Sequence, residues 1–369
     1  MLTPFLDLGL ATQELRGELD AAVGRVLDSG RFIGGEEVEV FEREFAAYSG
    51  GCHAVGAGNG LDALRLMLRA YEIGPGDEVI VPSNTYIATW LAVSEVGAKV
   101  VPVEPSITSY NLDPNWVEAA ITRRTRAILA VHLYGRRAEM GALRSLANQF
   151  GLLLLADAAQ GHGLLAPEAD ASAYSFYPSK NLGALGDGGA VITDDARIAQ
   201  KIRVLGNYGS REKYVNEVRG VNSRLDPLQA AILRVKLRVL EEWNLRRRAI
   251  ALKYRAALGD IPDLNLPDPG SAEPDGHVWH IFAVRHLERE RLARHLAAAG
   301  VGTLIHYPQP PHLSGAYRDA GFRTGDFPVA ERIAATELSL PLHPHLTDAQ
   351  TNQVIAAVVH AACRKASAA

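Results

Sequence analysis

The chain contains very little cysteine. Only Cys52 and Cys363 occur among its 369 residues, too few for a disulfide framework or a paired metal-binding motif. We therefore expect a fold without covalent cross-links, in a reducing compartment. His343 and His345 have no cluster of carboxylates or cysteines beside them, so they predict a turn before the last helix rather than a metal site.

Long apolar runs and a strong charge of one sign are also missing. Four leucines at 152–155 fall far short of the roughly 20 apolar residues of a membrane helix, and the first residues do not resemble a signal peptide. A formal net charge of −4 gives no reason to expect a nucleic-acid partner. The basic run Arg246–Arg248 is interpreted as the solvated face of a helix. These features predict a cytoplasmic protein with neither a membrane nor a nucleic-acid partner.

What the sequence does contain, from about residue 50 to 195, is a regular alternation of short apolar runs and amphipathic segments. Continuous apolar strands separated by helices are typical of a mostly parallel sheet covered on both faces. The segments predicted as strands are 53–58, 77–83, 98–104, 125–135, 152–159, 171–176 and 189–194, and those predicted as helices include 60–72, 86–97 and a segment that begins after Asp113.

The second half of the chain has a different pattern. From Pro227 it turns strongly helical, and a polar, proline-rich stretch at 262–276 resembles a surface connection. The remainder predicts a small α+β domain with a last helix from about Thr347. The expected division is a large α/β domain over 1–245, whose N-terminal segment is free to pack elsewhere, and a small C-terminal α+β domain over 246–369.

The polar residues of interest follow the predicted strands. Asp157 ends one strand, with Gln160 and His162 just after it, and Ser175 ends another, five residues before Lys180. Ligands of open parallel sheets bind at the carboxyl ends of strands. We therefore expect these side chains to surround a common site.

A glycine-rich turn, Gly58-Asn59-Gly60, follows the first predicted strand and opens a helix. A dinucleotide-binding fingerprint needs a third glycine at position 61, which is leucine. Two readings remain, a tight strand-to-helix turn or a cradle for the phosphate of a ligand smaller than a dinucleotide.

Lys180 lies between a strand and further glycines. It could be a solvated loop charge, but its surroundings favour a lysine that forms a Schiff base with pyridoxal 5'-phosphate (PLP). Asp157 would then pair with the protonated ring nitrogen, Gln160 would reach the ring hydroxyl, Ser175 would hold the phosphate and Tyr86 would stack on the ring. The lysine motifs of penicillin-recognising enzymes and of P-loops do not fit, because Tyr177 and Asn181 stand where those motifs need serine or threonine.

These residues lie in blocks that resemble the DegT/DnrJ/EryC1/StrS family of PLP-dependent nucleotide-sugar aminotransferases, nearly end to end and in family order. The blocks include VGAGNGLDALRLMLRA, GDEVIVPSNTYIATWLAV, ADAAQGHG, SFYPSKNLGALGDGGAV and GVNSRLDPLQAAILRVKL. The resemblance implies the aspartate aminotransferase (type I PLP) fold. It also implies a homodimer with shared active sites.

The resemblance further implies roles for individual residues. Lys180 is the implied catalytic residue, and the implied cofactor-binding residues are Gly58, Asn59, Gly60, Tyr86, Asp157, Gln160, Ser175, Lys180 and Asn222, the last reaching the cofactor of the neighbouring subunit. Arg224 is implied to approach the carboxylate of the amino donor. The cofactor would alternate between PLP and pyridoxamine phosphate.

The segment GTLIHYPQPPHLSGAY at 302–317 resembles the branch of the family that acts at C3. This implies transfer of the amino group of L-glutamate to C3 of a dTDP-3-keto-6-deoxyhexose, giving a dTDP-3-amino-3,6-dideoxyhexose. His162, Tyr177, His306 and Tyr307 would line the sugar pocket. The alternatives are a C4-specific sugar aminotransferase, a non-catalytic PLP-binding regulator and, on the glycine turn, an NAD-linked oxidoreductase.

Overall fold

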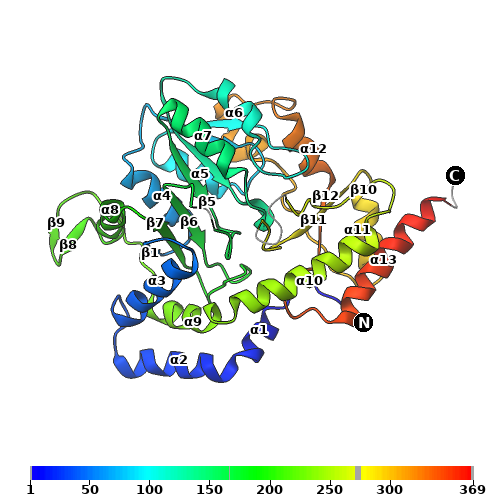
Figure 1. Cartoon of the computed structure of the whole chain (residues 1–369), viewed down its shortest axis with the longest axis horizontal. Helices are drawn as coiled ribbons and strands as arrows, with labels where there is room; N and C mark the ends of the chain where they lie inside the picture. The colour runs from blue at the N-terminus through cyan, green and yellow to red at the C-terminus, as the bar shows by residue number, and fades with distance from the viewer. Residues whose placement is uncertain (1, 166, 271–275, 367–369) are drawn as a thin grey trace.

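The computed structural model describes residues 2–165, 167–270 and 276–366. Its centre is a seven-stranded sheet with the order β1-β7-β6-β5-β4-β2-β3, in which β7 alone runs antiparallel to its neighbours. Figure 1 labels β1, β5, β6 and β7 of this sheet. The strands are β1 (His53–Ala57), β2 (Glu78–Pro82), β3 (Lys99–Val103), β4 (Thr125–Val131), β5 (Leu153–Asp157), β6 (Ala171–Ser175) and β7 (Gly189–Thr193). The predicted mostly parallel sheet is confirmed.

Helices cover both faces of this sheet. Val79 and Val81 pack into the cluster formed with α4 and α5, whereas Ile80 between them packs into the cluster formed with α6 and α7. Neighbouring side chains of one strand thus point to opposite faces, and burial on both sides explains the continuous apolar runs. The helices around the sheet are α3 (Glu36–Tyr48), α4 (Gly60–Ala70), α5 (Ala88–Glu95), α6 (Pro114–Ala120), α7 (Met140–Phe150), α8 (Ala196–Gly206) and α9 (Pro227–Leu237).

A smaller antiparallel sheet, with the order β10-β11-β12, forms the C-terminal part of the molecule. It shares an apolar cluster with helices α10, α11 and α13. The elements of this part are α10 (Leu240–Leu258), β10 (Leu264–Asn265), β11 (Phe282–His286), α11 (Arg289–Ala298), α12 (Pro328–Thr336), β12 (Glu337–Leu340) and α13 (Asp348–Ala366), with short 3-10 turns at Pro311–Leu313 and Gly315–Ala320. The predicted small α+β unit is present, and its boundary near residue 245 stays a prediction.

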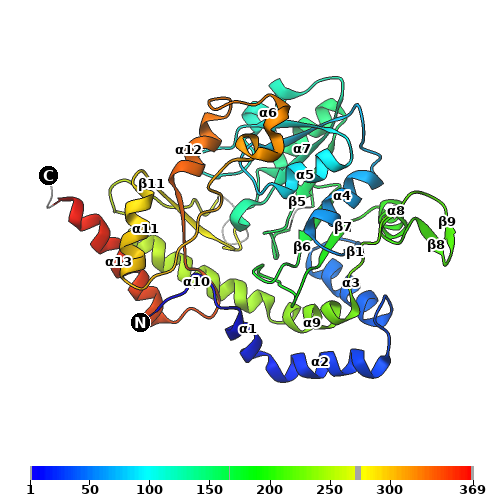
Figure 2. The same ribbon diagram turned by 180° about the vertical axis from the view of Figure 1, so that it is seen from behind.

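The N-terminal segment joins the two parts. Helices α1 (Leu8–Glu14) and α2 (Arg16–Ser29) precede α3, and α2 lies along α9 (Figure 2). Before them, Thr3 forms a bridge with Val301 of the small part. A hairpin of β8 (Ser210–Glu212) and β9 (Val215–Asn216) projects beside α8 at the far end of the molecule.

The helical stretch predicted from Pro227 consists of two helices, since α9 ends at Leu237 and α10 begins at Leu240. One sequence-based expectation needs correction. The basic run is not a uniformly solvated face, since Arg247 is buried and its Nη1 donates to Leu342 O at 2.8 Å. The run lies where α10 packs against the small sheet, and this contact buries one of its three arginines.

The histidines and cysteines singled out in the sequence lie outside the regular strands of the two sheets. His343 and His345 lie in the connection between β12 and α13, as predicted. Across the described residues, no group of three or more metal-binding side chains comes together, and none of the described helices is both long and apolar enough to cross a membrane. Cys363 lies in α13, in a stretch whose side chains are outside the described part of the structure.

Candidate active site

The carboxyl ends of the parallel strands bring the predicted polar residues to one edge of the sheet. β5 and β6 pair in parallel, and both β1 and β6 pair antiparallel with β7, so β1, β5 and β6 run in the same direction. The turn after β1, Asp157 at the end of β5 and Ser175 at the end of β6 therefore lie on the same side. This is the edge at which open α/β sheets bind ligands.

The turn from β1 to α4 is tightly held. Asn59 is the N-cap of α4, and its Oδ1 accepts from the Asp62 N–H at 2.8 Å. The Gly58 N–H donates to Ser223 Oγ at 2.9 Å. The capping side chain occupies one exposed donor of the first turn, and the remaining N–H groups at this positive helix end are available to an anion.

Ser175 lies directly against this helix end. A Cβ atom on Gly60 would come within 2.6 Å of the Ser175 Cβ and 3.1 Å of its Oγ, so position 60 has no room for a side chain. The serine hydroxyl and the start of α4 thus form a close pair of donor groups. Such a pair fits a phosphate group.

Asp157 is a buried acid without an ionic partner. It is 5% exposed, and its carboxylate accepts from Thr89 Oγ1 at 2.8 Å and from the Ala159 N–H at 3.1 Å. No described cation lies within ion-pair distance of it. Burial raises the pKa of Asp157 above its ordinary value, although the two hydrogen bonds and the charge of Lys180 act in the opposite sense. A buried carboxylate of this kind fits a ligand that brings a positive charge.

Lys180 lies in the loop after β6 and is half-buried. Burial lowers the pKa of Lys180 to about 8, and the nearby charge of Asp157 limits the decrease. Its backbone N–H donates to Tyr177 O at 2.8 Å, and the next residue, Asn181, anchors the loop by donating to Val278 O at 2.9 Å. A lysine whose pKa approaches neutrality supplies a nucleophilic amine and can act as a proton carrier.

Aromatic side chains form one wall of the site. Tyr86 is 54% exposed, and its ring centroid lies 5.2 Å from that of Tyr307. Gln160 Nε2 donates to Tyr307 Oη at 3.1 Å, so the residue predicted at a ring hydroxyl already contacts a phenol. Tyr86 comes just before α5, the helix that carries Thr89, which explains why the exposed ring and the acid occur together.

His306 is held by contacts from both parts of the molecule. Its Nδ1 lies 2.8 Å from Ser339 Oγ, and its backbone N–H donates to Glu337 Oε2 at 2.6 Å. Tyr134 Oη donates to its carbonyl oxygen. Burial and the charge of Lys180 lower the pKa of His306 to about 4, so the ring is neutral at pH 7.

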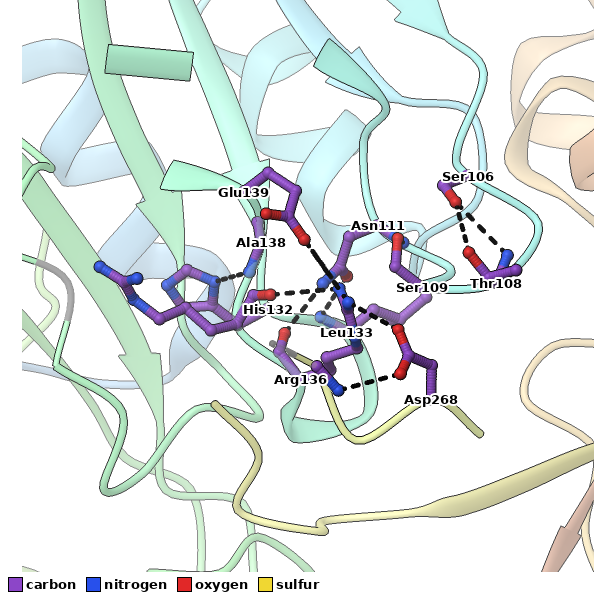
Figure 3. Close-up of polar contacts among 12 residues, drawn as sticks. Ser106, Thr108, Ser109, Asn111, His132, Leu133, Arg136, Ala138, Glu139 and Asp268 are labelled. Atoms are coloured by element: carbon purple, nitrogen blue, oxygen red, sulfur yellow. Dashed lines mark hydrogen bonds and ion pairs between the residues drawn. The ribbon is translucent and has the colours of Figure 1, made fainter. Parts of the chain in front are cut away.

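The Tyr134 contact depends on a well-anchored turn, Leu133–Gly135, directly after β4. Asn111 binds this turn from both sides, accepting from the Leu133 N–H at 3.0 Å and donating to Arg136 O at 2.9 Å (Figure 3). The guanidinium of Arg136 pairs with Asp268 at 2.9 Å. The turn that holds His306 is therefore tied to the segment between β10 and β11 of the small part.

Comparison with known proteins gives this arrangement a context. The sequence profile described as the DegT/DnrJ/EryC1/StrS aminotransferase family matches residues 13–359. The chain belongs to this family.

Individual members of the family are similar to the chain over nearly its whole length. The erythromycin biosynthesis sensory transduction protein EryC1 of Saccharopolyspora erythraea is 55% identical over 96% of this chain and 98% of its own. The dTDP-3-amino-3,4,6-trideoxy-alpha-D-glucose transaminase of Streptomyces venezuelae is 54% identical over 96% and 95%. A crystal structure of S. venezuelae DesV in complex with a ketimine intermediate superposes with a TM-score of 0.95, at 53% identity and 98% coverage of both chains. The type I PLP aminotransferase fold is thus confirmed.

Not every residue predicted from the family pattern lies at this edge within one chain. Arg224 Nη1 donates to Asn207 Oδ1 at 2.8 Å, and Asn222 pairs with Asn207 through the backbone. Arg224 also borders a cavity of about 290 Å³ lined by Arg203 and Arg211. The predicted contact of Asn222 with the cofactor of the neighbouring subunit and that of Arg224 with the donor carboxylate stay predictions.

Two of the predicted sugar-pocket residues have contrasting environments. His162 is 0% exposed, with its ring against Tyr174 and Phe176 at centroid distances of 5.6 and 5.9 Å. It therefore lies behind the surface of the site. Tyr177, in contrast, is 55% exposed. Direct contact of either side chain with a sugar stays a prediction.

Sequence reasoning missed several residues of the site. Thr89 binds the acid, Ser223 binds the glycine turn, and Glu337 and Ser339 hold His306. Thr89 follows Tyr86 by three residues on a predicted helix, so helical spacing could have placed it near the same strand end. Ser223 lies between Asn222 and Arg224, which were both predicted as site residues, so its position in the sequence could have indicated it. Glu337 and Ser339 come from a distant part of the sequence, and no local pattern relates them to the site.

Proposed function

We propose that this protein is a PLP-dependent aminotransferase that moves the amino group of L-glutamate to C3 of a dTDP-3-keto-6-deoxyhexose. The observation that carries the proposal is the pair formed by a buried, cation-free Asp157 and a Lys180 of lowered pKa at one sheet edge. The 54% identity to a dTDP-3-amino sugar transaminase over nearly the whole chain supports the C3 position.

The residues present fit the cofactor. Asp157 lacks a positive partner and would hold the protonated ring nitrogen. Ser175 and the start of α4, where Gly60 leaves no room for a Cβ, would hold the phosphate. Tyr86, with an exposed ring beside Tyr307, would cover the cofactor ring.

Lys180 and Asp157 have different roles in the proposed transfer of the amino group. PLP, when bound, supplies the aldehyde that accepts an amino group and a ring that stabilises negative charge. In each half-reaction, Lys180 Nζ would carry the proton between the substrate carbon that bears the nitrogen and the aldehyde carbon of the cofactor. Its pKa of about 8 lets it give and take that proton near neutral pH. Asp157, oriented by Thr89 Oγ1, would keep the ring nitrogen of the cofactor protonated and positively charged. Glutamate and a keto sugar are converted into 2-oxoglutarate and an amino sugar.

His306 and Tyr307 are the proposed sugar-side residues of the same chain. Tyr307 accepts a hydrogen bond from Gln160 on the cofactor side, and the charge of Lys180 contributes to the lowered pKa of His306. Neutral hydrogen-bonding groups suit the hydroxyl and carbonyl groups of a sugar. The product of the S. venezuelae relative is named as deoxygenated at C4 as well, so the C4 substituent of the present substrate is a variable that the experiments must include.

A homodimer with shared active sites is part of the proposal. Asn222 is exposed, and Arg224 lies beside the exposed ring of Tyr208. Both are close to the β8–β9 hairpin, which projects from the molecule (Figure 2). Residues in a projecting segment can reach a second copy of the chain, where Asn222 would meet the phosphate and Arg224 the donor carboxylate.

A glutamate half-reaction tests the proposal. The purified protein reconstituted with PLP should absorb at roughly 410–430 nm, as protonated imines of this cofactor do. Addition of L-glutamate should bleach this band and release one 2-oxoglutarate per site. A protein that keeps the band and releases no 2-oxoglutarate would instead be a PLP-binding regulator. The relative EryC1 is named as a sensory transduction protein, which is the reason to test this second candidate.

A further inference from the structure

His306 belongs to a chain of hydrogen bonds that continues into the small sheet. Ser339 Oγ, 2.8 Å from His306 Nδ1, also hydrogen-bonds to Glu337 Oε1, and Glu337 Oε2 accepts from the His306 N–H at 2.6 Å. The acid and the serine are two residues apart on β12, which places their side chains on the same face. Both are 0% exposed, so water does not compete for these bonds.

The remaining contacts of His306 fix its position as well. Tyr134 Oη holds its carbonyl oxygen, and the ring of Phe5 lies 5.6 Å from the imidazole. With Nδ1 occupied by Ser339, Nε2 is the ring nitrogen left for a ligand. The function of this nitrogen depends on which of the two carries the proton.

We propose that Glu337 and Ser339 are positioning residues that set the tautomer of His306, and thereby decide whether Nε2 donates or accepts a hydrogen bond at the sugar. The assignment of a sugar to this nitrogen rests on the proposed function. The tautomer itself does not, because it follows from contacts within the chain together with the protonation state of Glu337.

Hydrogen-bond counting links the acid to the imidazole. An ionised Glu337 only accepts, so the Ser339 hydroxyl donates to it. The Ser339 oxygen then accepts from His306 Nδ1–H, and Nε2 is a bare acceptor. A protonated Glu337 instead donates from Oε1 to Ser339, which donates to Nδ1, and Nε2–H becomes a donor. One proton on Glu337 therefore reverses the direction of the hydrogen bonds that link it through Ser339 to His306.

The surroundings of Glu337 favour the protonated state at pH 7. Burial raises the pKa of Glu337 to about 8, although Ser339, the His306 N–H and the charge of Arg289 act to lower it. Arg289 directs its guanidinium to the backbone oxygens of Ala334 and Glu337.

The facing strand and the turn after β4 supply no stronger counterion. Arg285 on β11 pairs in register with Glu337, but its guanidinium lies over the ring of Tyr110. Tyr110, Tyr134 and Tyr307 have raised pKa values and remain neutral. We therefore assign Nε2–H, a donor, to His306 at pH 7.

Two substitutions separate the alternatives. In Glu337→Gln the amide can accept from the His306 N–H and donate to Ser339, so it keeps the donor state at every pH. Ser339→Ala removes the link and leaves Nδ1 without its partner. Thr336→Val is the matched control, because it removes a buried hydroxyl one residue before β12 whose bond to Arg332 O does not involve His306.

Two readouts are needed. The first is the 15N spectrum of histidine-labelled protein, with the His306 signals assigned through His306→Asn. At pH 7 we expect a protonated Nε2 in the wild type and in Glu337→Gln, and a mixture of tautomers in Ser339→Ala. Raising the pH through about 8 should convert the wild type, but not Glu337→Gln, to the Nδ1–H form.

The second readout is kinetic. Ser339→Ala should raise KM for the keto sugar about tenfold, the effect of one lost hydrogen bond, while its glutamate half-reaction and that of Thr336→Val stay at the wild-type rate. The wild-type KM for the sugar should rise above pH 8, and that of Glu337→Gln should not.

Distinct results would overturn the inference. It fails if the wild-type Nε2 is unprotonated at pH 7, if Ser339→Ala keeps a single tautomer, or if Ser339→Ala slows both half-reactions equally, which would indicate general damage to the fold. Failure of the proposed function looks different. The wild type would then process no keto sugar, while the spectra would still report the tautomer.

Discussion

Single residues acquire their chemistry here from burial rather than from identity alone. Lys180 is half-buried and Lys236 is buried, and desolvation lowers the pKa of each lysine to about 8. Lys236 Nζ donates to Gly183 O at 2.6 Å, whereas Lys180 has Asp157 as its charged neighbour and no hydrogen bond from Nζ to any described residue. The free amine beside a buried acid is what makes Lys180 the candidate for catalysis.

Replacing this amine tests that assignment. Lys180→Ala should lower turnover by at least about 10³-fold, because proton transfer by a positioned group contributes 10² to 10⁴ and the covalent anchor is lost too. It should still bind pyridoxamine phosphate, since the contacts of Asp157 and Ser175 remain. Turnover and equilibrium dialysis measure the two effects, with the exposed Lys201→Ala as control. Wild-type turnover in purified Lys180→Ala would remove the lysine from the mechanism.

Prediction from sequence worked for residues that follow strands and failed for those that support them. Asp157 and Ser175 could be predicted because each ends an apolar run, and the ends of parallel strands meet at one edge of the sheet. Glu337 was not, because a lone glutamate at the start of a short strand looks like any solvated charge. Glu337 is buried by tertiary packing, and its partner His306 lies 31 residues away in the sequence. No local spacing indicates this contact.

At the scale of elements, the turn between β1 and α4 is the most sharply constrained. Its backbone is fixed by Asn59 as a cap and by Ser223 as an acceptor. Gly60→Ala should weaken binding of pyridoxamine phosphate about tenfold or more, because its Cβ would meet Ser175 at 2.6 Å and overpacking costs about 1–3 kcal/mol.

The matched control for the turn is Gly24→Ala. A Cβ at Gly24, within α2, meets nothing within 4 Å, so this variant should bind normally and gain up to about 1 kcal/mol of stability. Titration calorimetry and thermal unfolding measure both variants. Equal affinity of Gly60→Ala and the wild type would exclude this turn as the phosphate site.

Strand β12 carries a prediction on stability. The folded pKa of Glu337 is about 8, above its ordinary value near 4.5. Between these values the folded chain holds a proton that the unfolded chain has released, so this group makes the wild type less stable as pH rises. Glu337→Gln does not titrate. Its stability relative to the wild type should therefore increase from pH 5 to pH 8 in urea unfolding, and a constant difference would show that Glu337 ionises normally.

Element boundaries show where sequence patterns stop being informative. Apolar runs predicted all seven strands of the large sheet, because burial on both faces leaves a continuous signal. The helical stretch from Pro227 was predicted but its division into two helices was not, since nothing in the composition around Arg238 and Val239 interrupts a helical pattern. The buried Arg247 was missed for a related reason, as the partner that covers it comes from residue 342.

At the scale of the whole molecule, the site joins two sheets. Tyr134 from the large part and Glu337 from the small part hold the same histidine. Arg136 and Asp268 tie the turn after β4 to the segment between β10 and β11 of the small part (Figure 3). The fold thus positions sugar-side and cofactor-side residues relative to each other.

The proposed dimer can be tested by complementation. If Asn222 and Arg224 act in the partner's site, Lys180→Ala and Arg224→Ala chains should each be inactive alone. Mixed dimers, formed by mild unfolding and refolding of equal amounts, should regain up to about one quarter of wild-type activity, because half of the dimers are mixed and each has one intact site. Sedimentation should show two copies per particle. No recovery in verified mixed dimers would place all functional residues within one chain.

The central claim is that the amino group goes to C3 of a nucleotide-linked sugar, and one measurement tests it most directly. The pyridoxamine phosphate form of the protein is mixed with dTDP-linked 3-keto-6-deoxyglucose and, separately, with the 4-keto isomer. We predict that the 3-keto sugar restores the absorbance of the lysine-bound cofactor and yields a dTDP-3-amino sugar, while the 4-keto isomer does neither. Restoration by the 4-keto isomer alone would contradict the account.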